Sequence, residues 1–339
     1  MLVCTSCFKD EELIAFISSK GIENDCNVCD SGNVRVIDLE ELYDFFQELL
    51  INFELNERGS TLKSLIQSNW SFFSSDEIAA KILNIVIKKV DTSIINSESK
   101  VDFISEIKEN INYWFTLKQE LKGSRRFLSD INYLVQDLGW DSYFNSQFNL
   151  ESDKIYYRAR VHHKSELPPY PVKEMGCPTP TSTRGGRANP LGIPFLYLSD
   201  NEETVLYEVR ASFLDEISVG MFKVENNIKV KIVDFTERIS IYNPGNVNGL
   251  IKAHLLKRII SEDLSKPMRR YDSEIEYIPT QFICEFIKII TNAKGIQFKS
   301  SLHPKGNNLV IFDESLMKCT NVILKKITLL NIESEEIEK

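Results

Sequence analysis

A stretch in the second half of the chain brings together residue types that could hold a phosphorylated ligand. It runs from position 184 to 210 as RGGRANPLGIPFLYLSDNEETVLYEVR. Gly185 and Gly186 let the backbone pass close to a ligand or turn sharply, and Arg187 supplies a planar cation that suits phosphate or carboxylate groups. Glu208 adds a carboxylate near the end of the stretch. We therefore expect a binding site that combines a cation with a carboxylate.

The same stretch contains signals for the elements that would position these groups. Asn189-Pro190 predicts a turn, and the apolar run 193–198 predicts a buried strand. Asp200, followed three residues later by Glu203, is typical of the start of a helix. Glu208 lies on the flank of the apolar stripe of that helix, from which it could reach a cleft. The alternative is a solvated surface carboxylate, the more common state of glutamate.

Two more cations lie upstream, in the segment YRAR at residues 157–160. The run 155–161 predicts a strand, and Arg158 and Arg160 would lie on the same face because they are two residues apart. The guanidinium fork of Arg158 can bind phosphate through two parallel hydrogen bonds. The alternative for Arg158 is a surface ion pair, which contributes little to stability.

These segments resemble the RES family, which is named for an arginine, a glutamate and a serine. The resemblance is carried by YRAR at 157–160, by GGRANPLGIPFLYLSDNEETVLYEVR at 185–210 and by GIQFKSSLHPKGNNLVIF at 295–312. It implies a fold related to ADP-ribosyltransferases and an activity that destroys NAD+. Composition and periodicity alone indicate neither.

The resemblance assigns catalytic roles to Arg158, Glu208 and Ser300. Arg158 would grip phosphate, and Glu208 would bind a ribose hydroxyl and stabilise the positive charge that develops on the sugar. Ser300 follows the predicted strand GIQF by one residue, and Ser301 is the alternative. We assign Ser300 a hydrogen bond to phosphate or to the nicotinamide ribose, because a nucleophilic serine needs an adjacent base. His303 is the candidate for such a base.

Further residues are predicted to bind NAD+. Arg187 is the second phosphate or ribose contact, with Arg160 as a further candidate. Tyr197 would stack on the nicotinamide or, alternatively, pack in the core of the sheet. The complete predicted set is Arg160, Gly186, Arg187, Asn189, Tyr197, Gln281 and Ser301.

Four cysteines near the start of the chain have the spacing of a metal site. Cys4 and Cys7 form one CxxC pair, and Cys26 and Cys29 form a second pair after eighteen intervening residues. Four thiolates satisfy Zn2+ in tetrahedral geometry, and metal binding can replace the core that so short a segment lacks. We predict a structural zinc ribbon-like knuckle over residues 1–37. The alternatives are a redox pair or unliganded thiols.

Residues 38–150 carry helical patterns and predict a helical bundle with a regulatory role. This region resembles the HEPN-type domains that precede some RES domains. Many HEPN domains are RNases that use an arginine followed by a histidine. Arg125-Arg126 stand in a suitable place, but no histidine lies between residues 30 and 160. The bundle is therefore predicted to sense, dock or restrain, because the usual general base is missing.

Residues 151–331 form the predicted RES-like catalytic domain, and residues 332–339 form an acidic tail. The Pro- and Thr-rich stretch 167–183 is predicted to be irregular and could cover the cleft. The predicted fold class is α+β, with a zinc ribbon-like knuckle, a helical bundle and an ADP-ribosyltransferase-like mixed or antiparallel β domain. Strands are predicted at 155–161, 193–198, 219–223, 228–235, 296–298, 309–312 and 322–330, and further helices at 249–260 and 280–293.

The bulk composition excludes some classes of function. The formal net charge is −9 at pH 7, which argues against non-specific binding to nucleic acid or anionic lipid. No apolar run approaches the roughly 20 residues that span a bilayer, and the first residues lack the basic and apolar parts of a signal peptide. We expect a cytoplasmic protein.

The predicted function is degradation of NAD+ by cleavage of the bond between nicotinamide and ribose. Phosphate as the acceptor would make the protein an NAD+ phosphorylase, and water would make it a glycohydrolase. Because this activity drains a central metabolite, we expect a bacterial toxin or phage-defence effector restrained by an antitoxin or a trigger-sensing partner. One alternative is an ADP-ribosyltransferase that modifies a macromolecule. Another is a non-enzymatic zinc and helical interaction protein. A homo-oligomer is compatible with each.

Overall fold

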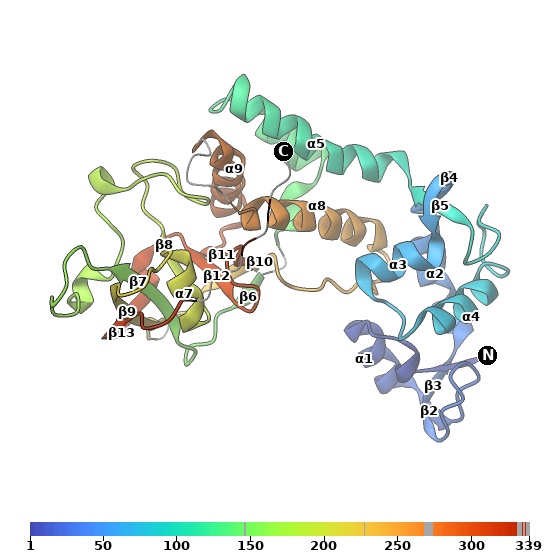
Figure 1. Ribbon diagram of the computed structural model, residues 1–339. Coiled ribbons are helices and arrows are strands. Elements are labelled where there is room, and N and C mark those ends of the chain that lie inside the picture. Colours follow the sequence, from blue (N-terminus) through green and yellow to red (C-terminus); the bar gives the residue numbers. More distant parts are fainter. Residues whose placement is uncertain (146, 227, 268–273, 331–333, 335, 337–339) are drawn as a thin grey trace. The chain divides into compact units, whose positions relative to one another are not determined.

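The computed structural model describes residues 1–145, 147–226, 228–267, 274–330, 334 and 336 (Figure 1). The chain divides into two compact units. Unit 1 comprises Met1–Thr116 and Arg238–Leu256, and unit 2 comprises Leu117–Glu237 and Lys257–Lys339. This division differs from the predicted one, because a segment from the second half of the chain belongs with the N-terminal unit.

Unit 1 begins with a small antiparallel sheet and a helix. Its strands are β1 (Leu2–Cys4), β2 (Ile22–Asn24) and β3 (Val34–Asp38), in the order β1-β3-β2, and α1 spans Glu11–Lys20. Asp10 caps α1 by accepting a hydrogen bond from the backbone N–H of Leu13. The buried carboxylate of Asp10 also accepts from the hydroxyl of Ser240 at 2.6 Å and from the N–H of Ile241 at 3.0 Å. One side chain therefore fixes the later segment to the start of the chain.

The remainder of unit 1 mixes helices with a two-stranded antiparallel sheet. Thr61 and Ser75 cap the helices that follow them, as helix-capping residues do. The two strands were not predicted, so the expectation of a helical bundle missed them. The elements are α2 (Tyr43–Leu50), β4 (Phe53–Thr61), α3 (Leu62–Trp70), α4 (Asp76–Val86), β5 (Lys100–Phe103) and α5 (Ser105–Gly123), which ends in unit 2, and β4 pairs with β5.

A single hydrophobic core runs through unit 1. Its aromatic centre contains Phe45, Phe46, Phe72 and Phe73, all of which are fully buried. The same core includes cysteines of the predicted knuckle and apolar residues from the helices. The predicted boundary between residues 37 and 38 therefore falls within one core.

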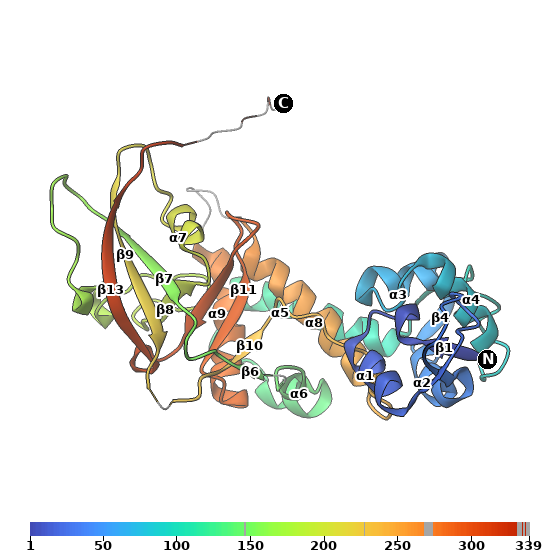
Figure 2. The ribbon, with the colours of Figure 1, turned by 90° about the horizontal axis from the view of Figure 1, so that it is seen from below.

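Unit 2 is built on an eight-stranded sheet, seen from another side in Figure 2. Its order is β13-β9-β7-β8-β12-β11-β10-β6, and within the described residues the neighbouring strands are antiparallel except for β10 and β11. Each strand predicted in this half of the chain has a counterpart in the sheet. The strands are β6 (Gln147–Asn149), β7 (Tyr156–Val161), β8 (Leu196–Ser199), β9 (Glu216–Val224), β10 (Lys231–Asp234), β11 (Gly295–Lys299), β12 (Asn307–Ile311) and β13 (Met317–Lys326).

Helices follow or separate these strands along the chain. They are α6 (Trp140–Tyr143), α7 (Glu202–Glu208), α8 (Val247–Ser265), which begins in unit 1, and α9 (Ile278–Phe286). Helix α7 contacts β7 and β8, and Figure 2 shows it beside the curved face of the sheet. Asn201 caps α7 by accepting from the N–H groups of Glu203 and Thr204. The predicted cap, Asp200, instead accepts from the backbone and side chain of Asn307.

Candidate active site

A cavity of about 320 Å3 lies against the sheet of unit 2. This volume is at the lower end of the range for small-molecule sites. The lining residues are Arg158, Ala159, Arg187, Tyr197, Leu198, Val205, Glu208, Val209, Phe298 and Asn308. Two cations, a carboxylate and two aromatic residues thus line one cavity, whose walls are otherwise mainly apolar.

Arg158 contributes a cation whose hydrogen-bonding capacity is largely unused. It lies on β7 and is half-buried. Its Nε atom is buried and has no hydrogen-bond partner, and Nη1 makes only a long bond of 3.5 Å to the carbonyl oxygen of Tyr197. No carboxylate of the described residues forms an ion pair with Arg158. Burial lowers the pKa of Arg158, yet arginine stays charged in proteins. Such a cation is suited to bind an anion.

Glu208 brings the carboxylate to the same cavity from the last position of α7. Its Oε1 atom accepts two hydrogen bonds of 2.7 Å, one from the hydroxyl of Ser300 and one from the amide nitrogen of Asn308. Asn308 was not predicted as a site residue. The signal that could have found it is a polar residue directly before the buried run LVIF, where its strand enters the sheet.

Ser300 lies in the turn between β11 and β12 and is buried. Its Oγ atom accepts from the N–H groups of Leu302 at 3.2 Å and His303 at 3.1 Å, and it donates its proton to Glu208. The sequence predicted that this hydroxyl would contact phosphate or ribose. In the structure this hydroxyl forms its hydrogen bonds with the carboxylate of Glu208 and with backbone N–H groups of its own turn.

The imidazole of His303 does not contact Ser300 and so is not placed to act as its base. Its Nδ1 atom lies 2.7 Å from the hydroxyl of Thr204, and its Nε2 atom faces Glu203 at 3.8 Å. The ring stacks on Tyr207 with centroids 5.0 Å apart. Only the backbone N–H of His303 reaches Ser300, so the side chain serves the packing of α7 against the 300–306 turn.

The glycine-rich turn is shaped by close contact between Gly186, Asn189 and Tyr197. A Cβ atom on Gly186 would lie 2.7 Å from Oδ1 of Asn189 and 2.8 Å from the hydroxyl of Tyr197. The hydroxyl of Tyr197 donates to that Oδ1 and accepts from the N–H of Ala188. The Nδ2 group of buried Asn189 is bonded to three backbone carbonyls, those of Arg184, Pro190 and Ile193. Position 186 therefore requires glycine, because there is no space for a Cβ atom.

Arg187 lines the cavity but is also anchored to neighbouring backbone. Its Nη1 donates to the carbonyls of Leu264 at 2.8 Å and Lys266 at 2.5 Å, and its Nη2 donates to Oγ of Ser301 at 3.2 Å. Burial lowers the pKa of Arg187. Gln281 supports the same turn by donating to the carbonyl of Gly186 at 2.8 Å. Ser301 and Gln281 therefore hold the turn and are not among the cavity-lining residues.

Arg160 lies outside the cavity lining, although it shares a strand with Arg158. Its guanidinium donates to the carbonyl of Glu174 and lies over the ring of Tyr170, 5.4 Å from the centroid. The fully buried Met175 and the bond from the N–H of Cys177 to Glu314 fix the same loop. The stretch predicted to be irregular is thus held against the sheet by specific contacts.

The four N-terminal cysteines form a compact cluster in unit 1. Their sulfur atoms all lie within 4.8 Å of one another, with separations of 3.9 Å for Cys4–Cys7, 3.5 Å for Cys4–Cys29 and 3.6 Å for Cys7–Cys26. A tetrahedral Zn2+ with bonds of about 2.3 Å to sulfur requires sulfur separations of about 3.8 Å. The donor set and its geometry therefore fit a bound zinc ion.

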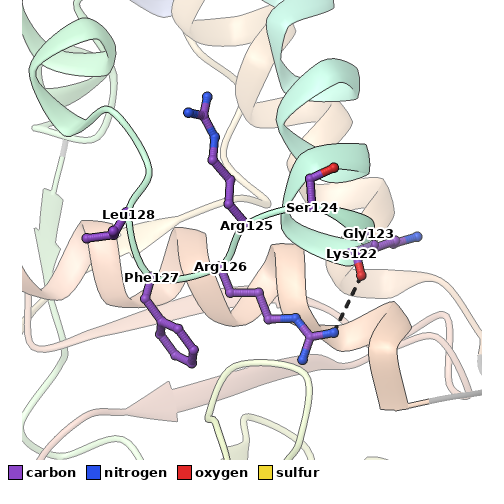
Figure 3. Close-up of a pocket in the computed structure, with 7 residues that line it drawn as sticks. All are labelled: Lys122, Gly123, Ser124, Arg125, Arg126, Phe127 and Leu128. Carbon is purple, nitrogen blue, oxygen red and sulfur yellow. Dashed lines mark hydrogen bonds between the residues drawn. The ribbon is translucent and has the colours of Figure 1, made fainter.

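A separate pocket of about 470 Å3 follows the end of α5 and is lined by residues 122–128 (Figure 3). Phe127 and Leu128 are largely exposed there. Arg125 pairs with Glu120, Lys122 pairs with Glu276, and Arg126 donates to the carbonyls of Leu121 and Lys122. The lining contains no carboxylate or imidazole, so this pocket lacks the groups for acid–base chemistry.

Comparison with known proteins identifies the C-terminal half. A family model described as the RES domain matches residues 155–329, which is just over half of the chain. The match includes every residue that lines the cavity of about 320 Å3. Neither the curated proteins nor the solved structures contain a match. Among the described residues, we find no helix with the length and apolar character needed to cross a membrane.

Proposed function

The chain belongs to the RES domain family, which is associated with NAD+-processing enzymes, and on this premise we propose that unit 2 cleaves the bond between nicotinamide and ribose in NAD+. Zn2+ has a structural role in this proposal, at the four cysteines of unit 1, and NAD+ is the substrate. The reaction then depends on side chains of the cavity alone.

The observation that carries the proposal is the placement of Arg158 and Glu208 on one cavity. Arg158 offers an uncompensated cation, and Glu208 offers a carboxylate on another wall. NAD+ carries a negatively charged pyrophosphate and a ribose that becomes positively charged as its glycosidic bond breaks. The two protein charges match these two charges of the substrate, and in a partly apolar cavity such matching is stronger than in water.

The proposed chemistry places the pyrophosphate near Arg158 and the nicotinamide ribose near Glu208. When the bond between C1′ of the ribose and the pyridinium nitrogen breaks, its electron pair neutralises the nicotinamide, which needs no general acid to leave. The sugar passes through an oxocarbenium-like state, as in glycoside hydrolysis. Glu208 stabilises that positive charge. An acceptor oxygen then bonds to C1′, and its proton passes to solvent.

The class of enzyme depends on the molecule that accepts the ADP-ribose group. Phosphate would give an ADP-ribose phosphate ester and make the protein a phosphorylase, whereas water would give free ADP-ribose. A hydroxyl or nucleophilic group of a macromolecule would make it a transferase. Arg187 supports phosphate, because it adds a second cation to the cavity wall and guanidinium groups bind phosphate well.

We further propose that this activity serves as a toxin or defence effector in the cytoplasm. Uncontrolled loss of NAD+ would stop growth, so the activity has to be restrained. Unit 1 contains the cluster of four cysteines and extra helices outside most of the RES match. We assign unit 1 the binding of an inhibitor or of the trigger that releases the enzyme.

The decisive experiment is to incubate the purified full-length protein with NAD+, with and without phosphate, and to identify the products by mass spectrometry. We expect release of nicotinamide, together with ADP-ribose phosphate or ADP-ribose. The variants Arg158→Ala and Glu208→Ala should lose turnover while remaining folded. Arg125→Ala is the matched control, because Arg125 is exposed and outside the cavity.

Two results would contradict the proposal. The first is intact NAD+ after prolonged incubation of a folded, metal-loaded protein. The second is full turnover in Glu208→Ala, which would remove the carboxylate from the mechanism. Labelled ADP-ribose bound to bulk protein or RNA would instead identify the acceptor as a macromolecule.

A further inference from the structure

The carboxylate of Glu208 is held through only one of its two oxygens. Ser300 and Asn308 both donate to Oε1, each over 2.7 Å. Among the described residues, no donor forms a hydrogen bond with Oε2. This oxygen is also not one of the buried atoms without a partner, so it is accessible. One oxygen is therefore saturated by the protein, and the other remains available to a ligand in the cavity.

The two donors are themselves fixed by the sheet. Asn308 lies on β12, where it is in register with Phe298 of β11 and Ser199 of β8, and its exposed fraction is 9%. Because β12 pairs on both sides, the backbone of Asn308 has little freedom to move. Its amide nitrogen consequently points at Oε1 from a rigid position.

The hydroxyl of Ser300 has one direction left for its proton. Its oxygen accepts two backbone N–H groups, from Leu302 and His303, and a hydroxyl has two acceptor positions and one proton. Its backbone N–H is bonded to the carbonyl of Gly306 at 3.0 Å, which closes the turn. The hydroxyl of Ser300 therefore donates its one hydrogen bond to Glu208.

We infer that Ser300 and Asn308 are positioning residues that hold Oε1 of Glu208, so that Oε2 is presented to the substrate ribose. This inference rests on the proposed function for its ribose ligand, and it assigns Asn308 a role in the site. Charge-assisted hydrogen bonds of this kind are short and directional. Their loss would let Glu208 change rotamer, and a misplacement of about 1 Å can reduce a rate by about 100-fold.

The first test is steady-state kinetics of Asn308→Ala. We expect kcat for NAD+ cleavage to fall by about 10- to 100-fold, with KM nearly unchanged, because the residue acts through Glu208. A large rise in KM at unchanged kcat would overturn the inference, since it would make Asn308 a substrate contact. Ser300→Ala should show the same pattern as Asn308→Ala.

Asn308→Asp provides a readout that a general loss of structure would not give. In this variant a neutral carboxyl group can donate a hydrogen bond to Glu208 as the asparagine amide does, whereas an ionised carboxylate repels it. The activity of the variant relative to the unmodified protein should therefore rise as pH is lowered. A ratio that stays constant with pH would contradict the inference.

A crystal structure of Asn308→Ala tests the same idea without any measurement of activity. We expect Glu208 to occupy more than one rotamer, while the backbone of β12 is unchanged. A single, unaltered rotamer would overturn the positioning role. Because this result does not depend on turnover, it separates failure of the inference from failure of the proposed NAD+ cleavage, which would appear as an inactive unmodified protein.

Discussion

The hydroxyl of Tyr197 donates a 2.8 Å hydrogen bond to Oδ1 of Asn189 and thereby joins β8 to the glycine-rich turn. The same oxygen accepts the N–H of Ala188 at 3.0 Å. Tyr197 also lines the cavity, and its hydroxyl sets the shape of the turn. The contact between its ring and nicotinamide stays a prediction.

Tyr197→Phe should destabilise the protein while keeping the ring at the cavity. The change leaves the N–H of Ala188 and the amide oxygen of buried Asn189 without a partner, and each unsatisfied buried group costs about 1–3 kcal/mol. Urea denaturation would measure the loss in the free energy of unfolding. Tyr207→Phe is the control, because Tyr207 is 45% exposed and uses its ring, not its hydroxyl, against His303. Equal stability of both variants would argue against the role of the Tyr197 hydroxyl.

Gly186→Ala should distort the turn beside the cavity. The new methyl group would overlap with Asn189 and with the hydroxyl of Tyr197, and overpacking of this kind costs about 1–3 kcal/mol. We expect a lower melting temperature and weaker NAD+ binding by calorimetry. Gly123→Ala is the matched control, because no atom lies within 4 Å of a Cβ atom there. Alanine at that helical position should be neutral or stabilising by about 0.5–1 kcal/mol.

Arg158→Met should separate stability from activity. The substitution keeps an unbranched side chain of similar length but removes a half-buried charge that has no ion-pair partner. A buried charge without a partner costs free energy of folding, and an apolar side chain does not carry that cost, whereas phosphate binding needs the guanidinium. We expect an unchanged or higher midpoint of urea denaturation together with loss of turnover. A variant that is much less stable than the original protein would show that other groups of the folded protein stabilise the charge of Arg158.

Removal of the metal should destabilise unit 1. The purified protein is expected to contain one zinc ion per chain by elemental analysis, bound by Cys4, Cys7, Cys26 and Cys29. Cys26→Ser should lose the ion and lower the melting temperature, because metal binding contributes folding energy in such small sites. The affinity should also fall at acid pH, since protons compete with the metal for the thiolates. Cys319→Ser, outside the cluster, should keep the full zinc content.

Local patterns in the sequence predicted most of the sheet that carries the candidate site. Runs of apolar residues bounded by turn residues indicated β7 to β13, because such runs reflect burial of individual strands. They also predicted that Arg158 and Glu208 would come from a strand and the following helix, and these two residues do line one cavity. The hydrogen bonds of Asn308 and Ser300 to Glu208 were not predictable, since they depend on how β11, β12 and α7 meet.

The failures in the N-terminal half have a common physical cause. The two-stranded sheet pairs residues 53–61 with residues 100–103, and such distant partners leave no mark on local periodicity. Likewise, the packing of residues 240 and 241 on Asp10 joins positions that are more than two hundred residues apart. Helices α3 and α4, by contrast, depend on local signals, since Thr61 and Ser75 cap them within the same stretch of chain.

The core of unit 1 includes Ile241, Val247, Ile251 and Leu255. A ribosome synthesises the chain from its N-terminus, so this core stays incomplete until residue 255 has emerged. The hollow at Arg158 is completed later still, because Phe298 and Asn308 form part of its wall. A nascent chain therefore has no complete cavity before residue 308 has been synthesised, and the proposed cleavage of NAD+ cannot begin while the earlier residues are still being made.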